Sequence, residues 1–326
     1  MSRLNISIPK DLAPLVSKWR RKINLSEICA QALRAELLAV ESHRSAQPLL
    51  AKLRQRSDLE KSVAERYELS EVLIAPDVPI HERDLRESLG RLTAGYINEH
   101  ISNGAVLALG GGRQTWCVVE QMLPRRIEVQ IVALGYRQND PYVLNAHANT
   151  LTTLLWLLFS PGATARLVGC DPEEVLNPSR AVTEAQPKYF VVGSCAPFTA
   201  QCPLARLLGE EVSKLLLAKG AVGDFLYSFF DENRRLVSAP VLDEQSVLSA
   251  ETLSMLSTRS DTRVILVAGG LEKLEIIRTT VEVNLCNVLV TDTATARALI
   301  ATNFSAARKH SPTRAVRPKR AGAAQS

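Results

Sequence analysis

The chain has 326 residues, more than one ordinary hydrophobic core serves, so at least two domains are expected. Hydrophobic residues make up 46% and charged residues 22%, a balance that is typical of a soluble globular protein. The net charge of +5 is modest, and it bears on function only where basic residues are concentrated.

The cysteine pattern and the lengths of the apolar runs bear on whether the chain binds a metal, enters a membrane or is exported. Six cysteines are scattered without a C-x-x-C pair, and the five histidines do not cluster with them, so we expect reduced core thiols, no metal and no cofactor. The chain opens on alternating polarity rather than a signal peptide. Its longest apolar run, 151–159, is far too short to span a bilayer. We therefore expect a cytoplasmic protein with no membrane partner.

Residues 1–40 have the pattern of one strand and two helices. Polar and apolar residues alternate strictly over 3–8, which predicts a strand with one exposed face. The exposed face carries Arg3, Asn5 and Ser7. Two runs at helical spacing follow, and 24–26 break the first and cap the second. Because a lone edge strand needs a partner, we expect a two-fold homodimer in which this strand pairs antiparallel with its copy.

This segment resembles the ribbon-helix-helix domain of the CopG/Arc/MetJ class, whose two-stranded ribbon enters the major groove of DNA. The resemblance implies that the exposed strand residues read base edges of a palindromic double-stranded operator. It also implies that backbone N–H groups at the start of the second helix hold phosphate, here at Leu25, Ser26 and Glu27. Seven Lys/Arg against three Asp/Glu in 1–40 suit phosphate contact. The alternative is a structural dimerisation arm with a solvated polar face.

The following segments lead into a second domain. Residues 41–57 are polar and basic with one proline, and they predict a helical or loose linker. A charged amphipathic helix from Asp58 and a short strand ending before Pro76 come next, and another helix is expected over 83–101.

Apolar strands then alternate with helices. The predicted strands are Ala105–Leu109, Glu128–Leu134, Tyr189–Val192, Val264–Ala268 and Asn287–Thr291. This alternation predicts a Rossmann-like, mostly parallel α/β sheet with helices on both faces. Ligands in such folds bind at the carboxyl ends of the strands, where the polar and glycine-rich segments of this chain fall.

The turn after the first of these strands is a candidate anion site. Gly110 to Gly112 let the backbone turn sharply, and Arg113, Gln114 and Thr115 supply donors before a helix. An ordinary strand-to-helix turn is the alternative, and the stretch by itself favours neither. Thr115 stands where a dinucleotide fingerprint has its third glycine, which argues against a dinucleotide.

Several motifs together resemble the effector domain of SorC/DeoR-type transcriptional regulators. They are the entry helix and strand of 58–76, Gly110-Gly111-Gly112-Arg113, Gly220-Ala-Val-Gly-Asp224, Val267-Ala-Gly-Gly-Leu-Glu-Lys273 and Asn287 to Ala296. The resemblance covers about 58–302. It implies a fold like that of sugar-phosphate isomerases and glucosamine-6-phosphate deaminase, a phosphorylated sugar as effector, and homodimers that can pair into a homotetramer.

Carried over motif by motif, the resemblance implies a set of effector-binding residues. They are Gly110, Gly112, Arg113, Gln114, Thr115, Arg137, His147, Asp224, Gly270 and Lys273. Gln114 stands where the family has threonine, and His147 where a relative has glutamine. Structural alternatives remain open, since Lys273 could solvate a helix start, Asp224 hold a turn and His147 be a structural histidine. The family also usually carries a helix-turn-helix rather than a ribbon-helix-helix.

These features predict a DNA-binding regulator controlled by a phosphorylated sugar. No nucleophile–base pair stands out, so we expect no enzyme activity. One alternative is an isomerase- or deaminase-like enzyme with a fused DNA-binding arm, and another is an autorepressor with a vestigial ligand domain. Residues 303–326 are basic and poor in apolar residues, and they predict a disordered tail.

Overall fold

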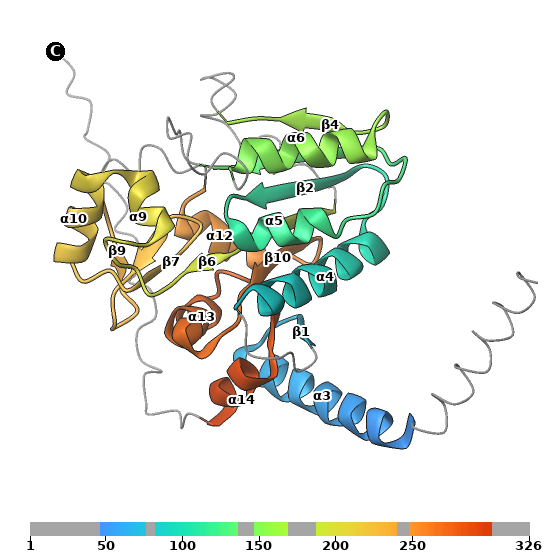
Figure 1. The fold of residues 1–326 in the computed structure, drawn as a ribbon, viewed down its shortest axis with the longest axis horizontal. Helices are drawn as coiled ribbons and strands as arrows, with labels where there is room; N and C mark the ends of the chain where they lie inside the picture. The colour runs from blue at the N-terminus through green and yellow to red at the C-terminus, as the bar shows by residue number, and fades with distance from the viewer. Residues whose placement is uncertain (1–45, 76–81, 136–146, 169–186, 240–247, 302–326) are drawn as a thin grey trace, which may run out of the picture. The chain divides into compact units, whose positions relative to one another are not determined.

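The computed structural model describes residues 46–75, 82–135, 147–168, 187–239 and 248–301 (Figure 1). The chain divides into two units, Met1–Asp58 and Leu59–Ser326. The predicted ribbon-helix-helix segment lies outside the described residues, as do Arg137 and the predicted tail beyond 302. Of the predicted linker, the described part is helical, because helix α3 spans Ala46–Tyr67.

The larger unit is built on a seven-stranded sheet in which every neighbouring pair of strands is parallel. The strands follow the order β1-β11-β10-β5-β2-β3-β4. Their bounds are β1 Glu71–Ala75, β2 Ala105–Gly110, β3 Val129–Leu134, β4 Thr164–Arg166, β5 Lys188–Val192, β10 Thr262–Val267 and β11 Val288–Asp292. All five apolar strands predicted over 105–291 are therefore confirmed to within two residues at each end, together with the parallel arrangement.

Helices cover both faces of this sheet, as predicted. On one face lie α4 (Glu82–His100), α5 (Arg113–Glu120) and α6 (Ala148–Phe159). On the other lie the end of α3, α12 (Ala250–Ser257), α13 (Leu274–Glu282) and α14 (Thr293–Ala301). Successive residues of β2 serve the two cores in turn, since Val106 and Ala108 pack in one and Leu107 and Leu109 in the other. A strand buried on both faces has to be apolar throughout, which is why it appears in the sequence as an unbroken run.

A second, antiparallel sheet was not predicted. Its order is β6-β7-β8-β9, with bounds Ser194–Cys195, Gly223–Phe225, Ser228–Phe230 and Leu236–Val237. Helices α9 (Pro203–Leu208) and α10 (Glu210–Ala218) pack on it around a small apolar core that includes Phe198 and Phe229. In Figure 1 these yellow elements form a lobe beside the strands of the large sheet. Strands of two or three residues are too short to show a period of two.

Helices α4 and α5 approach each other closely at one glycine. A Cβ added at Gly90 would lie 2.6 Å from the carbonyl oxygen of Cys117 and 2.9 Å from its Cβ. Gly95 lies on the same helix but is exposed, and a Cβ there would meet nothing within 4 Å. The two glycines therefore separate the effect of helix packing from the effect of helix propensity.

We expect Gly90→Ala to lower the free energy of unfolding by about 1–3 kcal/mol, because the added methyl group meets backbone that cannot rotate away. Gly95→Ala should raise it by up to about 1 kcal/mol, because alanine favours the helix and finds open space. Urea unfolding followed by circular dichroism measures both changes. Equal effects of the two substitutions would contradict the close contact.

Candidate functional site

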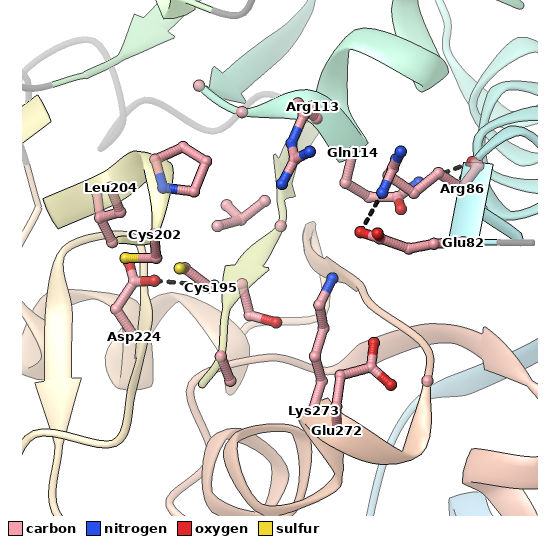
Figure 2. A pocket seen from close by; sticks show the side chains of 18 of the residues that line it. Glu82, Arg86, Arg113, Gln114, Cys195, Cys202, Leu204, Asp224, Glu272 and Lys273 are labelled. Atoms are coloured by element: carbon pink, nitrogen blue, oxygen red, sulfur yellow. Dashed lines mark hydrogen bonds and ion pairs between the residues drawn. The ribbon is translucent and has the colours of Figure 1, made fainter. Parts of the chain in front are cut away.

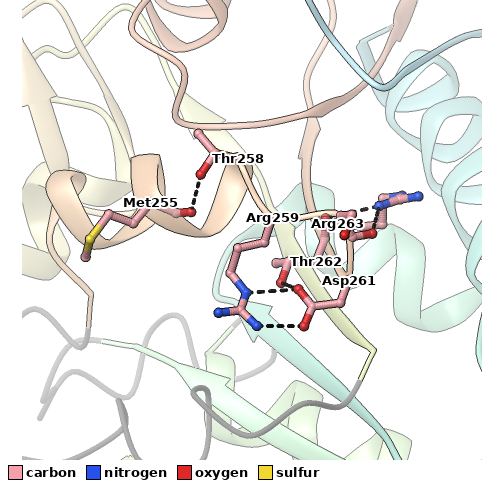
Figure 3. Close-up of polar contacts among 7 residues, drawn as sticks. Met255, Thr258, Arg259, Asp261, Thr262 and Arg263 are labelled. Carbon is pink, nitrogen blue, oxygen red and sulfur yellow. Dashed lines mark hydrogen bonds and ion pairs between the residues drawn. The ribbon is translucent and has the colours of Figure 1, made fainter.

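A cavity of about 770 Å³ opens where the carboxyl ends of four parallel strands meet the small sheet (Figure 2). Gly111 follows β2, Gly193 follows β5, Gly270 follows β10 and Asp292 ends β11, and all four line the cavity. This is the edge at which a parallel α/β sheet binds its ligands. Such a volume lies within the usual range for a small-molecule site, roughly 300–1,000 Å³.

The structure brings together most of the residues that the sequence singled out. The cavity is lined by Gly112, Arg113, Gln114, His147, Asp224, Gly270 and Lys273. Gly110 and Thr115 lie beside it without lining it, and Thr115 is fully buried. Arg137 lies outside the described residues.

The glycine turn leaves the start of α5 open. Gly112 precedes the helix with φ 121°, a conformation that side chains disfavour, and no described side chain caps the first turn. The first backbone N–H groups of a helix lack partners within the helix, so they remain as donors. Arg113, the first residue of α5, lines the cavity beside them.

Gln114 has a structural role that the sequence did not suggest. Its side chain is buried, and Nε2 donates a hydrogen bond to the backbone carbonyl of Arg86 at 3.0 Å. Its Cβ would lie 3.3 Å from a Cβ added at Gly193. The amide thus ties α5 to α4, and the glycine after β5 makes room for it.

The first two turns of α4 contribute residues that sequence analysis missed. Glu82, Leu85 and Arg86 line the cavity, and the guanidinium of Arg86 forms an ion pair with Glu82 (Figure 2). This helix precedes the first glycine motif in the chain, so only the tertiary fold brings it to the site. An amphipathic helix with charged residues in its first turn carries no sequence signal that separates a cavity wall from a solvated face.

Lys273 is held at the cavity by a network of hydrogen bonds under its turn. Asp292 accepts hydrogen bonds from the backbone N–H of Gly270 at 2.8 Å and from the hydroxyl of Thr295 at 2.6 Å. This network joins the turns after β10 and β11 and fixes the short 3₁₀ helix Leu271–Lys273 that ends at the lysine. Burial lowers the pKa of Lys273, and the nearby Glu272 and Glu82 carboxylates oppose that shift.

Two cationic side chains face the same space. Figure 2 shows the guanidinium of Arg113 and the ammonium of Lys273 pointing toward each other across the cavity. Among the described residues neither takes part in an ion pair, whereas Arg86 is paired with Glu82. Unpaired cations in a partly buried site favour an anionic ligand.

Asp224 and His147 each have a structural hydrogen bond as well as a place in the cavity wall. The Asp224 carboxylate accepts from the backbone N–H of Cys195 at 2.9 Å and of Tyr227 at 3.0 Å. Burial raises the pKa of Asp224 to about 7, although these two donors oppose the rise. His147 precedes α6, and its Nδ1 accepts from the N–H of Asn149 at 3.3 Å. Both structural alternatives raised by the sequence are therefore realised in the fold.

Apolar side chains form another part of the wall. Leu85, Leu204, Leu207 and Leu226 line the cavity, so charged and apolar surfaces face the same space. Among the described residues no group of histidine, cysteine, aspartate and glutamate side chains is arranged to hold a metal ion. In that part of the chain no helix has the length and hydrophobicity needed to cross a membrane.

We expect the free energy of unfolding to fall as the pH rises from about 4 to about 7. The folded chain holds the Asp224 proton more tightly than the unfolded chain does, so this contribution is complete below the unfolded pKa and is lost through the folded pKa of about 7. The loss amounts to at most about 4 kcal/mol. Urea unfolding at several pH values should show a shallower fall for Asp224→Asn, and Glu251→Gln, at an exposed position on α12, serves as the control. Equal pH slopes for the wild type and Asp224→Asn would contradict the expectation.

The chain matches the family model described as "Putative sugar-binding domain" over residues 51–155 and 172–301, which is more than half of its length. It is 26% identical over 251 residues to the deoxyribonucleoside regulator of Bacillus subtilis (strain 168), covering 72% of this chain and 77% of that protein. It is 28% identical over 268 residues to the erythritol catabolism regulatory protein EryD of Brucella abortus (strain 2308), covering 74% and 78%.

Solved structures share the fold. The full-length sorbitol operon regulator SorC from Klebsiella pneumoniae matches with a TM-score of 0.61 and 18% identity over 90% of this chain and 100% of that one. A DeoR family transcriptional regulator from Listeria monocytogenes matches with a TM-score of 0.59 and 16% identity over 75% and 99%. The curated relatives are regulators and not enzymes. The chain therefore belongs to the sugar-binding domain family, and it is a transcriptional regulator of the SorC/DeoR type that a sugar effector controls.

Proposed function

We propose that the effector is a phosphorylated sugar, that it binds in the cavity at the carboxyl ends of the parallel strands, and that it changes the affinity of the N-terminal region for a palindromic DNA operator. The observation that carries the proposal is the pair of cations, Arg113 and Lys273, which face one cavity without an ion-pair partner among the described residues. A phosphate group would complement both charges, which a neutral sugar cannot do.

The phosphate is assigned to the end of the cavity at the glycine turn. The open first turn of α5 offers backbone donors and the positive end of a helix dipole. Arg113 adds a planar fork of donors that matches phosphate oxygens, and Lys273 adds a compact charge from the opposite wall.

The sugar is assigned to the side of the cavity at the small sheet. Asp224 uses one hydrogen bond on each carboxylate oxygen for the fold, and each oxygen keeps a second lone pair for a hydroxyl donor. His147 also lines the cavity, from the start of α6, and the leucine side chains of the wall suit the apolar face of a sugar ring. Asp224 and His147 would therefore recognise the sugar while also making hydrogen bonds that stabilise the cavity wall.

The DNA binding that the effector controls is assigned to residues 1–40. A ribbon-helix-helix homodimer, formed through the N-terminal strand, would read the operator with Arg3, Asn5 and Ser7 and hold phosphate at Leu25, Ser26 and Glu27. The effector controls this output only by binding two arrangements of the protein with different affinity. Pairing of two such dimers would give a homotetramer. A DNA-bound regulator of this kind acts in the cytoplasm.

We expect a phosphorylated sugar to raise the melting temperature of the full chain, and its unphosphorylated counterpart to raise it much less. Lys273→Ala and Arg113→Ala should each weaken the binding by about 10- to 100-fold, because each removes a charge-assisted hydrogen bond. Lys214→Ala is the matched control, since that lysine is exposed on α10 and pairs with Glu210 away from the cavity.

Thermal shifts over a panel of aldose and ketose phosphates identify the sugar, and calorimetric titration then measures the affinities. A sugar phosphate that binds all four proteins equally would contradict the assigned site. Turnover of any member of the panel would instead favour an isomerase- or deaminase-like enzyme. Failure of the whole panel to bind would favour a DNA-binding autorepressor with a vestigial ligand domain.

We expect Asn5→Ala to lose discrimination between operator and unrelated DNA by about tenfold or more, because a bidentate contact to a base edge contributes about 1–3 kcal/mol to specificity. Lys18→Ala should weaken both kinds of DNA alike, because a phosphate contact carries no sequence information. Gel shifts with operator and scrambled duplexes at the same salt concentration separate the two effects. Unchanged operator preference in Asn5→Ala would contradict base reading by the strand.

A further inference from the structure

Two of the cysteines lie together in the wall of the cavity. Cys195 ends the short strand β6, and Cys202 precedes helix α9, seven residues later. Both are half-buried and both line the cavity. Cys117 and Cys286 are buried, as expected for core thiols, but Cys195 and Cys202 face the cavity, so the expectation of core thiols is wrong for these two.

The two thiols contact each other. Figure 2 shows their sulfur atoms facing one another above Asp224. The sulfur of Cys202 accepts a hydrogen bond from the backbone N–H of Ala205 at 3.3 Å. The start of α9 thus directs a backbone donor at Cys202, with the Cys195 sulfur beside it.

This arrangement gives the two thiols different acidities. The neighbouring Cys195 thiol lowers the pKa of Cys202, and the backbone N–H groups of Thr199, Ala205 and Leu204 lower it further, against the effect of burial. Cys202 in turn raises the pKa of Cys195, and burial and the neighbouring Asp224 carboxyl add to the rise. Cys202 is therefore suited to react first, as the thiolate nucleophile, and Cys195 to react second, as the thiol that attacks the oxidised Cys202.

We propose that Cys195 and Cys202 form an oxidation site, at which a hydroperoxide converts the two thiols of one chain into a disulfide in the wall of the effector cavity. The placement of the two sulfur atoms side by side, their shared exposure to the cavity and the backbone hydrogen bond to Cys202 carry this proposal.

The reaction balances with hydrogen peroxide as the oxidant. The Cys202 thiolate attacks one peroxide oxygen, the O–O bond breaks, and the departing hydroxide takes up a proton to become water, which leaves a sulfenic acid on Cys202. The sulfur of Cys195 then attacks the sulfur of Cys202. The S–S bond forms, the S–O bond breaks, and the hydroxyl group leaves as water with the proton from Cys195. Two thiols are oxidised to one disulfide while one peroxide is reduced to two waters.

The disulfide would join the end of β6 covalently to the start of α9. Both ends of this link lie in the wall beside Leu204 and Asp224, so oxidation would alter the surface that the effector meets. That consequence rests on the proposed function. The oxidation itself does not, and it can be measured without an effector or DNA.

The test uses the full chain, reduced, freed of reductant and treated with hydrogen peroxide at pH 7. Remaining thiols are blocked with a maleimide after denaturation, and the protein is digested with trypsin without reduction. Residues 189–206 contain no internal lysine or arginine, so one tryptic peptide carries both cysteines. We expect this peptide to lose the mass of two hydrogens and to carry no maleimide, and the number of free thiols to fall from the six of the reduced chain to four.

Variants separate the roles of the two sulfurs. Cys195→Ser should stop at a sulfenic acid on Cys202, which dimedone traps, and Cys202→Ser should leave Cys195 unoxidised at the same peroxide dose. Cys117→Ser is the control and should still form the disulfide. Should a variant fail to fold, the peptide mass of the wild type decides by itself. A wild-type peptide 189–206 that keeps both thiols, links to another chain, or carries a sulfinic acid beside a free Cys195 would overturn the proposal.

Discussion

The parallel pairing of β2, β5 and β10 is the constraint on which the rest of the structure depends. Each strand is buried on both faces, so its backbone groups must find partners in the neighbouring strands. Parallel strands all end at the same edge, and the loops that follow them are brought together whatever their separation along the chain. The glycine turn at 110–112, Gly193 and the turn at Lys273 become neighbours for this reason.

The sequence was most informative where burial is complete. The apolar runs of β2, β3, β5, β10 and β11 stand out because both of their faces are covered, and the glycine turns after them mark the edge of the sheet. The cavity-lining role of Arg113 and Lys273 could be predicted for the same reason, since each follows directly on such a strand and turn.

Features that depend on tertiary contacts could not be predicted. The small antiparallel sheet has strands of only two or three residues, and Arg86 reaches the cavity from a helix that precedes the first glycine motif. The sequence places Gln114 among the donors of the glycine turn, because its hydrogen bond to a backbone carbonyl 28 residues away is invisible in the sequence. The contact of Cys195 with Cys202 likewise exists only because β6 and the start of α9 fold against each other.

The close approach at Gly90 has a consequence for the size of the ligand. Glu82, Leu85 and Arg86 lie in the two turns of α4 before this glycine, so the distance between α4 and α5 also sets how far these side chains stand from the glycine turn. Because Gly90 has no Cβ, the two helices lie close together, and their spacing fixes one dimension of the cavity. The width available to a ligand is decided by the contact between two helices, at a residue that the ligand never touches.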